Sequence, residues 1–250
     1  MSTSKKFKYL LVFSLPLLMA FTDPAKKVKV YLVGDSTISI KPVSKYPETG
    51  WGMPFAYFFD ESVEVDNRAQ NGRSTKSFIK EGRWKAVTDS LKKGDYVFIQ
   101  FGHNDEAKAK STYTTEEEFK SYLEKYVNET LKAGSFPVLI TPVARRRFDS
   151  EGKVKESHEL YSAIVRNVAS ALKVPMIDLD KRSMALMQEM GAEHSKLLFN
   201  QLIPGQHPNY PAGMNDNTHF NEYGARRIAE LVLSELKKLN LELASRIVKR

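Results

Sequence analysis

The chain of 250 residues contains no cysteine. This absence excludes disulfide bonds, thiol nucleophiles and lipid attachment at a leader cysteine. The sequence also lacks internal repeats, and no linker rich in proline, glycine and serine divides it. Its stability must therefore come from one packed core, and the length is sufficient for a single α/β domain.

Long apolar runs are scarce, and only the N-terminal one has the character of a targeting segment. Lys5, Lys6 and Lys8 precede the apolar run 9–21, whose 13 residues are too few to cross a bilayer comfortably. This order predicts a signal peptide over residues 1–22, an exported domain over residues 23–250, and a periplasmic or extracellular location. No small-x-small pattern marks the cleavage site, so an uncleaved anchor stays open, although no stable membrane insertion is expected once the leader is removed.

Charge of one sign is not concentrated in any tract of the chain. The formal net charge is +8, of which the leader lysines supply +3, so the remainder carries +5. A basic balance suits nucleic acid, an anionic membrane or an acidic polymer. Because the Lys and Arg residues are spread over the sequence, most are expected to form a solvated surface, and no nucleic-acid partner is predicted.

Apolar β-branched runs alternate with segments of helical periodicity. The expected strands are 28–33, 63–65, 95–101, 137–141 and 174–179, and the expected long helices are 116–133, 157–172 and 221–239. Thr115 precedes Glu118 in the spacing of a capping box, which marks the start of the first of these helices. Strands that alternate with helices predict a mostly parallel, five-stranded sheet between two helix layers, a three-layer α/β/α sandwich.

Four short polar blocks contain the residues best suited to chemistry. They are Gly-Asp-Ser-Thr at 34–37, Asn-Gly-Arg-Ser at 71–74, Gly-His-Asn-Asp at 102–105 and Asp-Asn-Thr-His at 216–219. The first three follow strand candidates directly, and the fourth precedes the last expected helix. Because ligand sites of parallel α/β sheets form beyond the carboxyl ends of the strands, the blocks are expected to meet there.

Ser36, His219 and Asp216 are the candidate catalytic residues. Ser36 offers a hydroxyl nucleophile, His219 a base that takes its proton, and Asp216 an ionised carboxylate that orients the imidazole. A spacing of three places Asp216 and His219 on one side of a turn or of a first helical turn. The alternatives are that Ser36 and Thr37 cap a helix, and that Asp216 or Asn217 caps the last helix beside a surface histidine.

Three groups are candidates for an oxyanion hole. They are the backbone N–H of Ser36, the backbone N–H of Gly72, which has no side chain to block an approaching oxygen, and the side-chain amide of Asn104. Gly72 also suits a positive-φ turn, and Asn104 also suits the capping of a loop. Both of these roles are compatible with donation to an oxyanion.

The four blocks resemble those of the SGNH (GDSL) hydrolases, a superfamily with a flavodoxin-like α/β/α sandwich and a Ser-His-Asp triad. Further segments resemble its rhamnogalacturonan acetylesterase branch, namely 50–52, 71–74, 78–79, 82–84, 94–105, 141–143 with the arginines that follow, and 216–220. The resemblance implies a serine carbohydrate esterase that removes O-acetyl groups from pectin through an acetyl-enzyme intermediate. It gives Ser36, His219 and Asp216 the roles of the triad and needs neither a metal nor an organic cofactor. Ser36, Gly72 and Asn104 would form the oxyanion hole.

The partner expected from this resemblance is an acetylated acidic polysaccharide or oligosaccharide. Arg73, Arg145 and Arg146 follow strand ends, where a guanidinium can hold a carboxylate, and a solvated role is equally open for each. Trp51 is predicted to stack on a sugar ring, with core packing as the alternative. These four residues form the predicted substrate-binding set, and the 200–215 region is expected to set substrate preference.

Other chemistries stay open. A metal-dependent phosphoesterase could draw ligands from Asp35, His103, Asp105, Asp216 and His219. However, block 102–105 inverts the Gly-Asn-His-Asp order usual in such enzymes. A non-catalytic carbohydrate-binding protein, and an esterase that acts on a lipid or on another acylated polysaccharide, are the remaining alternatives.

Two histidines receive no catalytic role from the sequence. His103 is expected to be structural, beside Asn104, and His207 to be a loop histidine. The sequence leaves open which acetylated position is attacked, whether the 200–215 region moves on binding, and the oligomeric state.

Overall fold

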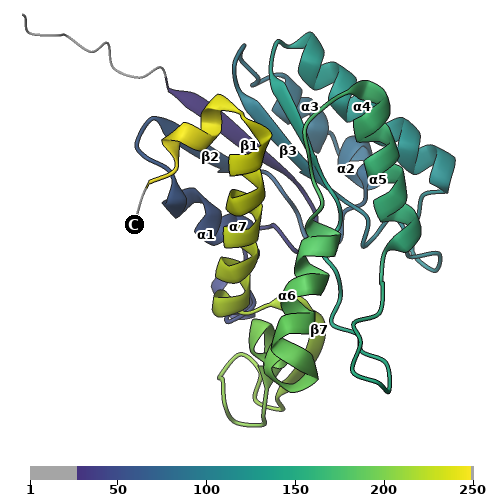
Figure 1. Ribbon diagram of the computed structural model, residues 1–250, viewed down its shortest axis with the longest axis vertical. Coiled ribbons are helices and arrows are strands. Elements are labelled where there is room, and N and C mark those ends of the chain that lie inside the picture. The colour runs from purple at the N-terminus through teal and green to yellow at the C-terminus, as the bar shows by residue number, and fades with distance from the viewer. Residues whose placement is uncertain (1–26, 249–250) are drawn as a thin grey trace, which may run out of the picture.

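The computed structural model describes residues 27–248, and its centre is a five-stranded sheet (Figure 1). The signal peptide predicted for residues 1–22 lies outside the described residues. Every neighbouring pair of strands is parallel, and the order across the sheet is β2-β1-β3-β4-β5. The strands are β1 (Val28–Gly34), β2 (Val63–Asn67), β3 (Tyr96–Gln100), β4 (Phe136–Ile140) and β5 (Met176–Ile177). The predicted parallel sheet is thus confirmed.

Both faces of this sheet are buried, because successive side chains of the central strands enter two different cores. Val30 and Leu32 of β1 belong to one core, and Tyr31 and Val33 belong to the other. A strand covered on both faces needs an apolar residue at nearly every position. This requirement explains why the central strands are nearly continuous apolar runs in the sequence.

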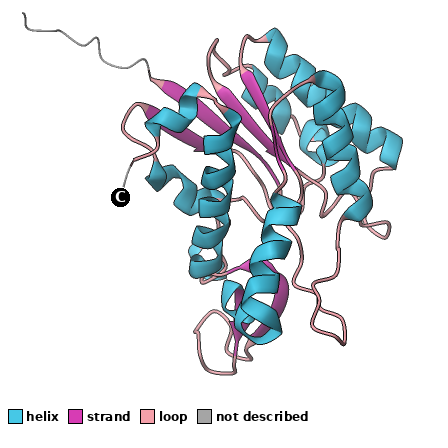
Figure 2. Cartoon of the chain, in the orientation of Figure 1, coloured by secondary structure: helices cyan, strands magenta, loops and turns pink. Residues whose placement is uncertain are grey.

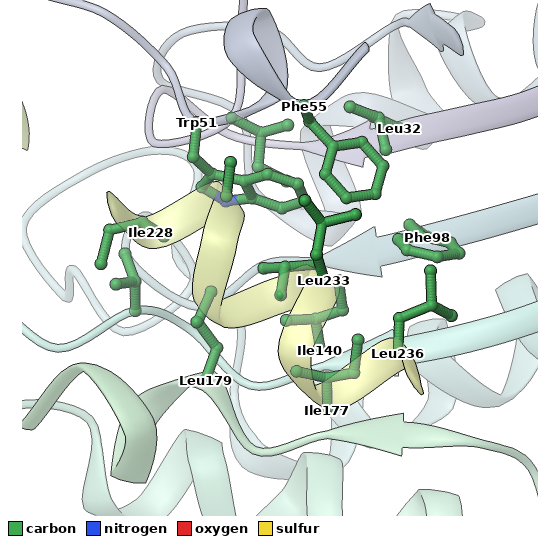
Figure 3. Packing of buried hydrophobic residues seen from close by; sticks show 14 of the residues in the cluster. Leu32, Trp51, Phe55, Phe98, Ile140, Ile177, Leu179, Ile228, Leu233 and Leu236 are labelled. Atoms are coloured by element: carbon green, nitrogen blue, oxygen red, sulfur yellow. The ribbon is translucent and has the colours of Figure 1, made fainter. Parts of the chain in front are cut away.

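Helices cover both faces and complete the predicted three-layer α/β/α sandwich (Figure 1). They are α1 (Gly52–Phe55), α2 (Thr75–Lys80), α3 (Arg83–Thr88), α4 (Glu116–Lys132), α5 (Glu159–Leu172), α6 (Leu179–His194) and α7 (Glu222–Leu236). Residues of α2, α3, α4 and α5 share a core with Tyr31, whereas residues of α1, α6 and α7 share the opposite core with Leu32. Figure 3 shows the second of these cores, in which Leu233 and Leu236 of α7 lie among side chains of the sheet.

Helices α4, α5 and α7 match the three predicted long helices to within three residues at each end. The capping box of α4 is confirmed, because Thr115 and Glu118 each accept the backbone N–H of the other, at 3.2 and 3.0 Å. Helix α6 differs from the prediction of a strand over 174–179. Only two residues of that run pair with β4, and Asp178 then caps α6.

Two further strands form an antiparallel hairpin apart from the main sheet (Figure 2). β6 (Phe199–Leu202) pairs with β7 (Met214–Phe220), and residues 203–213 connect them. Asn221 ties the hairpin to α7, because its side chain accepts the Gly224 N–H and donates to the Phe199 carbonyl. The polar residues of these strands lack the apolar alternation of a typical strand, so the sequence pattern does not predict them. Within residues 27–248, no helix is both long and apolar enough to cross a bilayer.

Candidate active site

Ser36 lies just beyond the carboxyl end of β1, at the edge where the polar blocks are predicted to meet. The Asp35 carboxylate closes the turn by accepting the N–H and the hydroxyl of Thr37 at 2.9 and 2.8 Å. A Cβ at Gly34 would lie 2.5 Å from the Gln100 carbonyl oxygen, so only glycine fits between β1 and β3 at this point. A turn and not a helix follows Ser36, and the helix-capping alternative for Ser36 is therefore wrong.

His219 connects Ser36 to Asp216. Its Nε2 lies 2.9 Å from the Ser36 Oγ, and its Nδ1 lies 2.7 Å from the Asp216 Oδ2. The other carboxylate oxygen of Asp216 accepts the backbone N–H groups of Thr218 and His219, at 2.7 and 3.0 Å. The three side chains predicted to be catalytic are thus joined in one hydrogen-bonded relay.

The backbone that supports this relay differs from the prediction. Asp216 and His219 lie on strand β7 and not in a turn or a helix. Strict alternation along a strand would place residues three apart on opposite faces. Between two paired positions of the hairpin, however, β6 contributes only Asn200 while β7 contributes the four residues 216–219. This bulge bends the strand and brings the two side chains together.

Asp216 is held in its charged form. Burial opposes the charge, but hydrogen bonds from the His219 ring and from the backbone N–H groups of His219 and Thr218 outweigh it. The pKa of the Asp216 carboxyl therefore lies below its usual value. At neutral pH the carboxylate can accept a hydrogen bond from the Nδ1–H, which leaves Nε2 as the hydrogen-bond acceptor that faces Ser36.

Gly72 and Asn104, the other predicted oxyanion donors, lie on the second and third polar blocks. Gly72 is exposed and has a φ of +75°, and no acceptor for its N–H is found within residues 27–248. Asn104 is buried, and its Nδ2 donates to the Arg73 carbonyl at 3.1 Å. One amide proton of Asn104 therefore stays available for a further acceptor.

Lys41, which is not among the predicted site residues, connects the second block to the nucleophile turn. Its Nζ donates to the Ser36 carbonyl at 2.6 Å and to the Asn71 Oδ1 at 2.8 Å, and it pairs with the Glu48 Oε1 at 2.7 Å. Burial lowers the pKa of the Lys41 ammonium, and the pairing with Glu48 opposes that shift. No signal in the sequence distinguishes Lys41 from Lys45, four residues later.

The prediction that Trp51 stacks on a sugar ring is wrong. Trp51 is 0% exposed and lies in the core, and its Nε1 donates to the Gln100 Oε1 at 2.8 Å. Its ring meets the Phe55 ring edge-on, with the centroids 5.4 Å apart (Figure 3). The alternative of core packing is the correct one for this residue.

Arg146 has a structural role, whereas its predicted contact with substrate stays a prediction. Its Nε donates to the Ser195 Oγ and its Nη1 to the Asn217 Oδ1, each at 3.0 Å, and its Nη2 donates to the Ala192 carbonyl. Each of the three nitrogens thus makes one hydrogen bond within the protein, which uses three of the five N–H donors of the guanidinium. Through its bond to Asn217 of β7, Arg146 anchors the hairpin.

Arg73 and Arg145 are less fully engaged. Arg73 donates its Nη1 to the Asn71 carbonyl at 2.8 Å and its Nε to the Glu81 carboxylate. Arg145 is partly exposed and donates its Nη1 to the Thr218 Oγ1 at 2.7 Å, beside the relay. Of the predicted substrate-binding set, Arg145 is thus the residue bonded to the neighbour of His219.

Buried titratable groups lie behind the third block. His103 is buried, and within residues 27–248 neither of its ring nitrogens has a hydrogen-bond partner. Burial, with the nearby His158 and Arg145 charges, holds the pKa of His103 well below its usual value, so the ring is neutral. The ring packs against His158 with the centroids 4.2 Å apart, which agrees with a structural role.

Asp105 is buried in the same region. Its Oδ1 accepts the N–H and the hydroxyl of Thr75 at 3.0 and 2.5 Å. Burial raises the pKa of Asp105 to about 7, although the hydrogen bonds from Thr75 oppose this shift. His207 lies in the 203–213 loop, as expected, and accepts the Asn209 N–H.

Two of the residues considered as metal ligands, Asp216 and His219, are hydrogen-bonded to each other in the relay. In the described part of the chain, no group of three or more His, Asp or Glu side chains is arranged to hold a metal ion.

Comparisons with known sequences give a consistent picture. The GDSL-like Lipase/Acylhydrolase family matches residues 32–227. A rhamnogalacturonan acetylesterase of Bacillus subtilis (strain 168) is 41% identical over 226 residues, which cover 90% of this chain and 96% of that protein. A rhamnogalacturonan acetylesterase of Emericella nidulans is 27% identical over 226 residues and is matched over 82% of each chain.

A solved structure also resembles the three-layer sandwich. The crystal structure of the Bacillus subtilis protein YxiM superposes with a TM-score of 0.75 at 28% identity. The match covers 88% of this chain and 59% of that chain.

Proposed function

The chain belongs to the GDSL-like lipase/acylhydrolase family and is a carboxylic ester hydrolase, and on this premise we propose that it removes O-acetyl groups from rhamnogalacturonan. The Bacillus subtilis relative with that activity in its name matches 90% of this chain at 41% identity. The Emericella nidulans relative carries the same activity in its name. The substrate class rests on these two similarities.

The relay from Ser36 through His219 to Asp216 is the observation that supports the chemistry. Contacts of 2.9 and 2.7 Å are within range for proton transfer from the serine hydroxyl to the imidazole. The depressed pKa of Asp216 keeps a negative charge beside the imidazolium that forms. We therefore assign Ser36 as the nucleophile, His219 as the general base and Asp216 as the group that orients it.

Acylation begins when the Ser36 Oγ attacks the acetyl carbonyl carbon and its proton passes to the His219 Nε2. The carbonyl oxygen becomes negatively charged and accepts hydrogen bonds from the Ser36 N–H, the Gly72 N–H and the Asn104 Nδ2. When the tetrahedral intermediate collapses, the bond to the sugar oxygen breaks and His219 gives its proton to that oxygen. The products are a free sugar hydroxyl and an acetyl group on Ser36.

Deacylation repeats these steps with water. A water molecule attacks the acetyl carbonyl while His219 removes its proton. The same three donors hold the oxyanion. Collapse returns the proton to the Ser36 Oγ and releases acetate. The side chains of the relay supply every proton transfer in this scheme, so it includes no metal or organic cofactor.

We assign recognition of the acidic polymer to Arg145 and to the 203–213 loop. The Arg145 guanidinium lies beside the relay through its bond to Thr218, where it can meet a galacturonate carboxylate next to the acetylated sugar. The loop is fixed over the segment that follows the nucleophile turn. Its Asn209 Nδ2 donates to the carbonyls of Val43 and Tyr46, at 2.8 and 2.9 Å.

We further propose that residues 1–22 are a signal peptide and that residues 23–250 form the exported catalytic domain. The basic start and the short apolar run of the leader support this division. N-terminal sequencing of the protein recovered outside the cytoplasm tests it, and a leader that is still attached would contradict it.

The decisive experiment measures acetate release from acetylated rhamnogalacturonan and from acetylated xylan. Wild type, Ser36→Ala and the control Ser234→Ala, an exposed serine on α7, are compared in the presence of a chelator. Circular dichroism verifies that each variant is folded. We expect release from rhamnogalacturonan by the wild type and the control and none by Ser36→Ala.

Each alternative predicts a different result. Equal release from both polymers would keep the serine esterase and reject the narrow substrate. Activity that survives in Ser36→Ala would reject the nucleophile, and loss of wild-type activity in the chelator would favour a metal enzyme.

Arg145→Met tests the proposed recognition. It should raise the KM for the acidic polymer several-fold and leave the KM for a small uncharged aryl acetate unchanged. Arg147→Met, at an exposed neighbour, is the matched control.

A further inference from the structure

We propose that Lys41 and Arg73 are positioning residues that hold the Asn71–Gly72 peptide from two sides and thereby aim the Gly72 N–H at the oxyanion. This inference rests on the proposed function, because it assigns a cause to the geometry of one proposed oxyanion donor. Neither residue needs to touch the substrate. Both act through the peptide that contains the donor.

Lys41 fixes the position of this peptide relative to the nucleophile. Its side chain is fully buried, and the ammonium makes three short contacts, with the Ser36 carbonyl, the Asn71 Oδ1 and the Glu48 carboxylate. Two of these acceptors lie on the two turns that provide backbone oxyanion donors. An ammonium has three protons, so these acceptors use all of them and hold the turns at a fixed separation.

Ser39 supports the same attachment. Its hydroxyl donates to the Asn71 Oδ1 at 2.5 Å, so this side-chain oxygen receives two donors from the segment that follows the nucleophile. A side-chain amide oxygen that accepts from two donors of one turn has little freedom to move. These two contacts hold the side chain of Asn71 independently of any contact to its backbone.

Arg73 fixes the direction of the peptide. Its Nη1 donates to the Asn71 carbonyl at 2.8 Å, and that carbonyl belongs to the same peptide unit as the Gly72 N–H. In a trans peptide the C=O and the N–H point in opposite directions. A guanidinium on the oxygen therefore turns the N–H away from Arg73, and the positive charge on the acceptor side strengthens the N–H as a donor.

The third proposed oxyanion donor is connected to the same turn, through the residue that follows Gly72. The Asn104 Nδ2 donates to the Arg73 carbonyl at 3.1 Å, one residue beyond Gly72. The side chain of Arg73 is held in turn by Glu81, whose carboxylate accepts its Nε at 3.0 Å. A displacement of Arg73 would therefore disturb two of the three donors.

The test compares Lys41→Met with Lys45→Met, which makes the same change at an exposed lysine four residues away. The kcat and KM for an aryl acetate and for the acetylated polymer are measured with thermal stability. We expect Lys41→Met to lower kcat by about 10- to 100-fold, because a misplacement of about 1 Å can cost about 10²-fold. The KM should stay within threefold, and Lys45→Met should match the wild type.

The split between kcat and KM separates positioning from a purely structural role. A folded Lys41→Met with a kcat within twofold of the wild type would overturn the inference, and so would a change confined to KM. Ser36→Ala in the same assay makes the outcomes distinguishable. If Ser36→Ala retains activity the proposed function fails, whereas if Ser36→Ala is inactive and Lys41→Met is unaffected only the inference fails.

Arg73→Met is the second variant, and it decides the matter if Lys41→Met does not fold. Its matched control is Arg83→Met, because Arg83 also pairs with Glu81, at 2.7 Å, but is not hydrogen-bonded to Asn71. We expect a loss of kcat at least tenfold greater in Arg73→Met than in Arg83→Met, again with little change in KM for the aryl acetate. Equal kcat values for the two variants would overturn the inference.

Discussion

The Asp216 carboxylate binds His219 at two points, accepting the ring Nδ1 at 2.7 Å and the backbone N–H at 3.0 Å. The two bonds use different oxygens, so the carboxylate cannot rotate without breaking one of them. The orientation of the imidazole is thereby fixed relative to its own backbone. This double attachment makes the β7 bulge part of the geometry of the relay.

Asp216→Asn should lower kcat by about 10⁴-fold with little change in KM. The amide would present an N–H to Nδ1, which would then carry no proton, and the proton on Nε2 would prevent it from accepting from Ser36. Steady-state hydrolysis of an aryl acetate measures this effect. Asp149→Asn is a suitable control, because the Asp149 carboxylate also accepts nearby backbone N–H groups but lies on an exposed loop. A loss below tenfold in the folded variant would count against the assigned role.

Gly72→Ala and Gly82→Ala form a matched pair. Both glycines have a φ near +70°, at +75° and +72°, and a Cβ at either position would meet no atom within 4 Å. Each substitution should cost about 1–2 kcal/mol in the free energy of unfolding, because an L-residue is strained in this region. Only Gly72→Ala should also lower kcat, by tenfold or more, since its methyl group would lie beside the proposed oxyanion donor. Urea unfolding and aryl acetate kinetics on both variants test the pair, and an equal kcat would remove Gly72 from the site.

Trp51→Phe should lower stability without weakening binding of the polymer. The indole N–H donates to Gln100, whose amide in turn donates to the Thr37 hydroxyl at 3.0 Å. Loss of that donor leaves a buried oxygen without a partner, at a cost of about 1–3 kcal/mol. Urea unfolding together with the KM for acetylated rhamnogalacturonan checks this. A raised KM with unchanged stability would restore the rejected stacking role.

Asp105→Asn should change how stability depends on pH. With a pKa of about 7, the folded state keeps a proton on Asp105 that the unfolded state has already lost above about pH 4. The unfolded state then binds fewer protons, so this group lowers stability as the pH rises from about 4 to 7. The asparagine variant lacks this contribution. Its free energy of unfolding relative to that of the wild type should rise by on the order of 2–4 kcal/mol from pH 5 to pH 8.

Urea unfolding at several pH values measures the difference between Asp105→Asn and the wild type. Asp89→Asn, at an exposed carboxylate, should show a difference that stays constant over the same range. A constant difference for Asp105→Asn as well would show that Asp105 is ionised throughout.

The sequence was sufficient to predict the layers of the fold and to single out the four polar blocks that contain the candidate catalytic residues. A buried parallel strand requires an unbroken apolar run, and an amphipathic helix requires a regular period, so both leave clear patterns. The hairpin that holds Asp216 and His219 leaves no such pattern. Its strands are polar, and it is held by Arg146, which lies 71 residues before Asn217 in the sequence, as well as by Asn221, which caps α7.

Individual side chains of the site were harder to predict than the blocks. Lysine is almost never fully buried unless it is paired, so nothing in the sequence singles out Lys41. Its burial depends on Glu48 and on two oxygens supplied by separate turns. Trp51 and Arg146 illustrate the converse, because residue types suited to sugars and carboxylates are equally suited to internal hydrogen bonds.

Ser36 follows a strand of the main sheet whereas His219 lies on the separate hairpin, and 183 residues separate the two in the sequence. Closing so long a loop is slow compared with forming local helices. During refolding, helical structure should therefore recover before the first ester is cleaved. Recovery of esterase activity should therefore mark the last stage of folding, because turnover requires the hairpin to be docked against the end of β1.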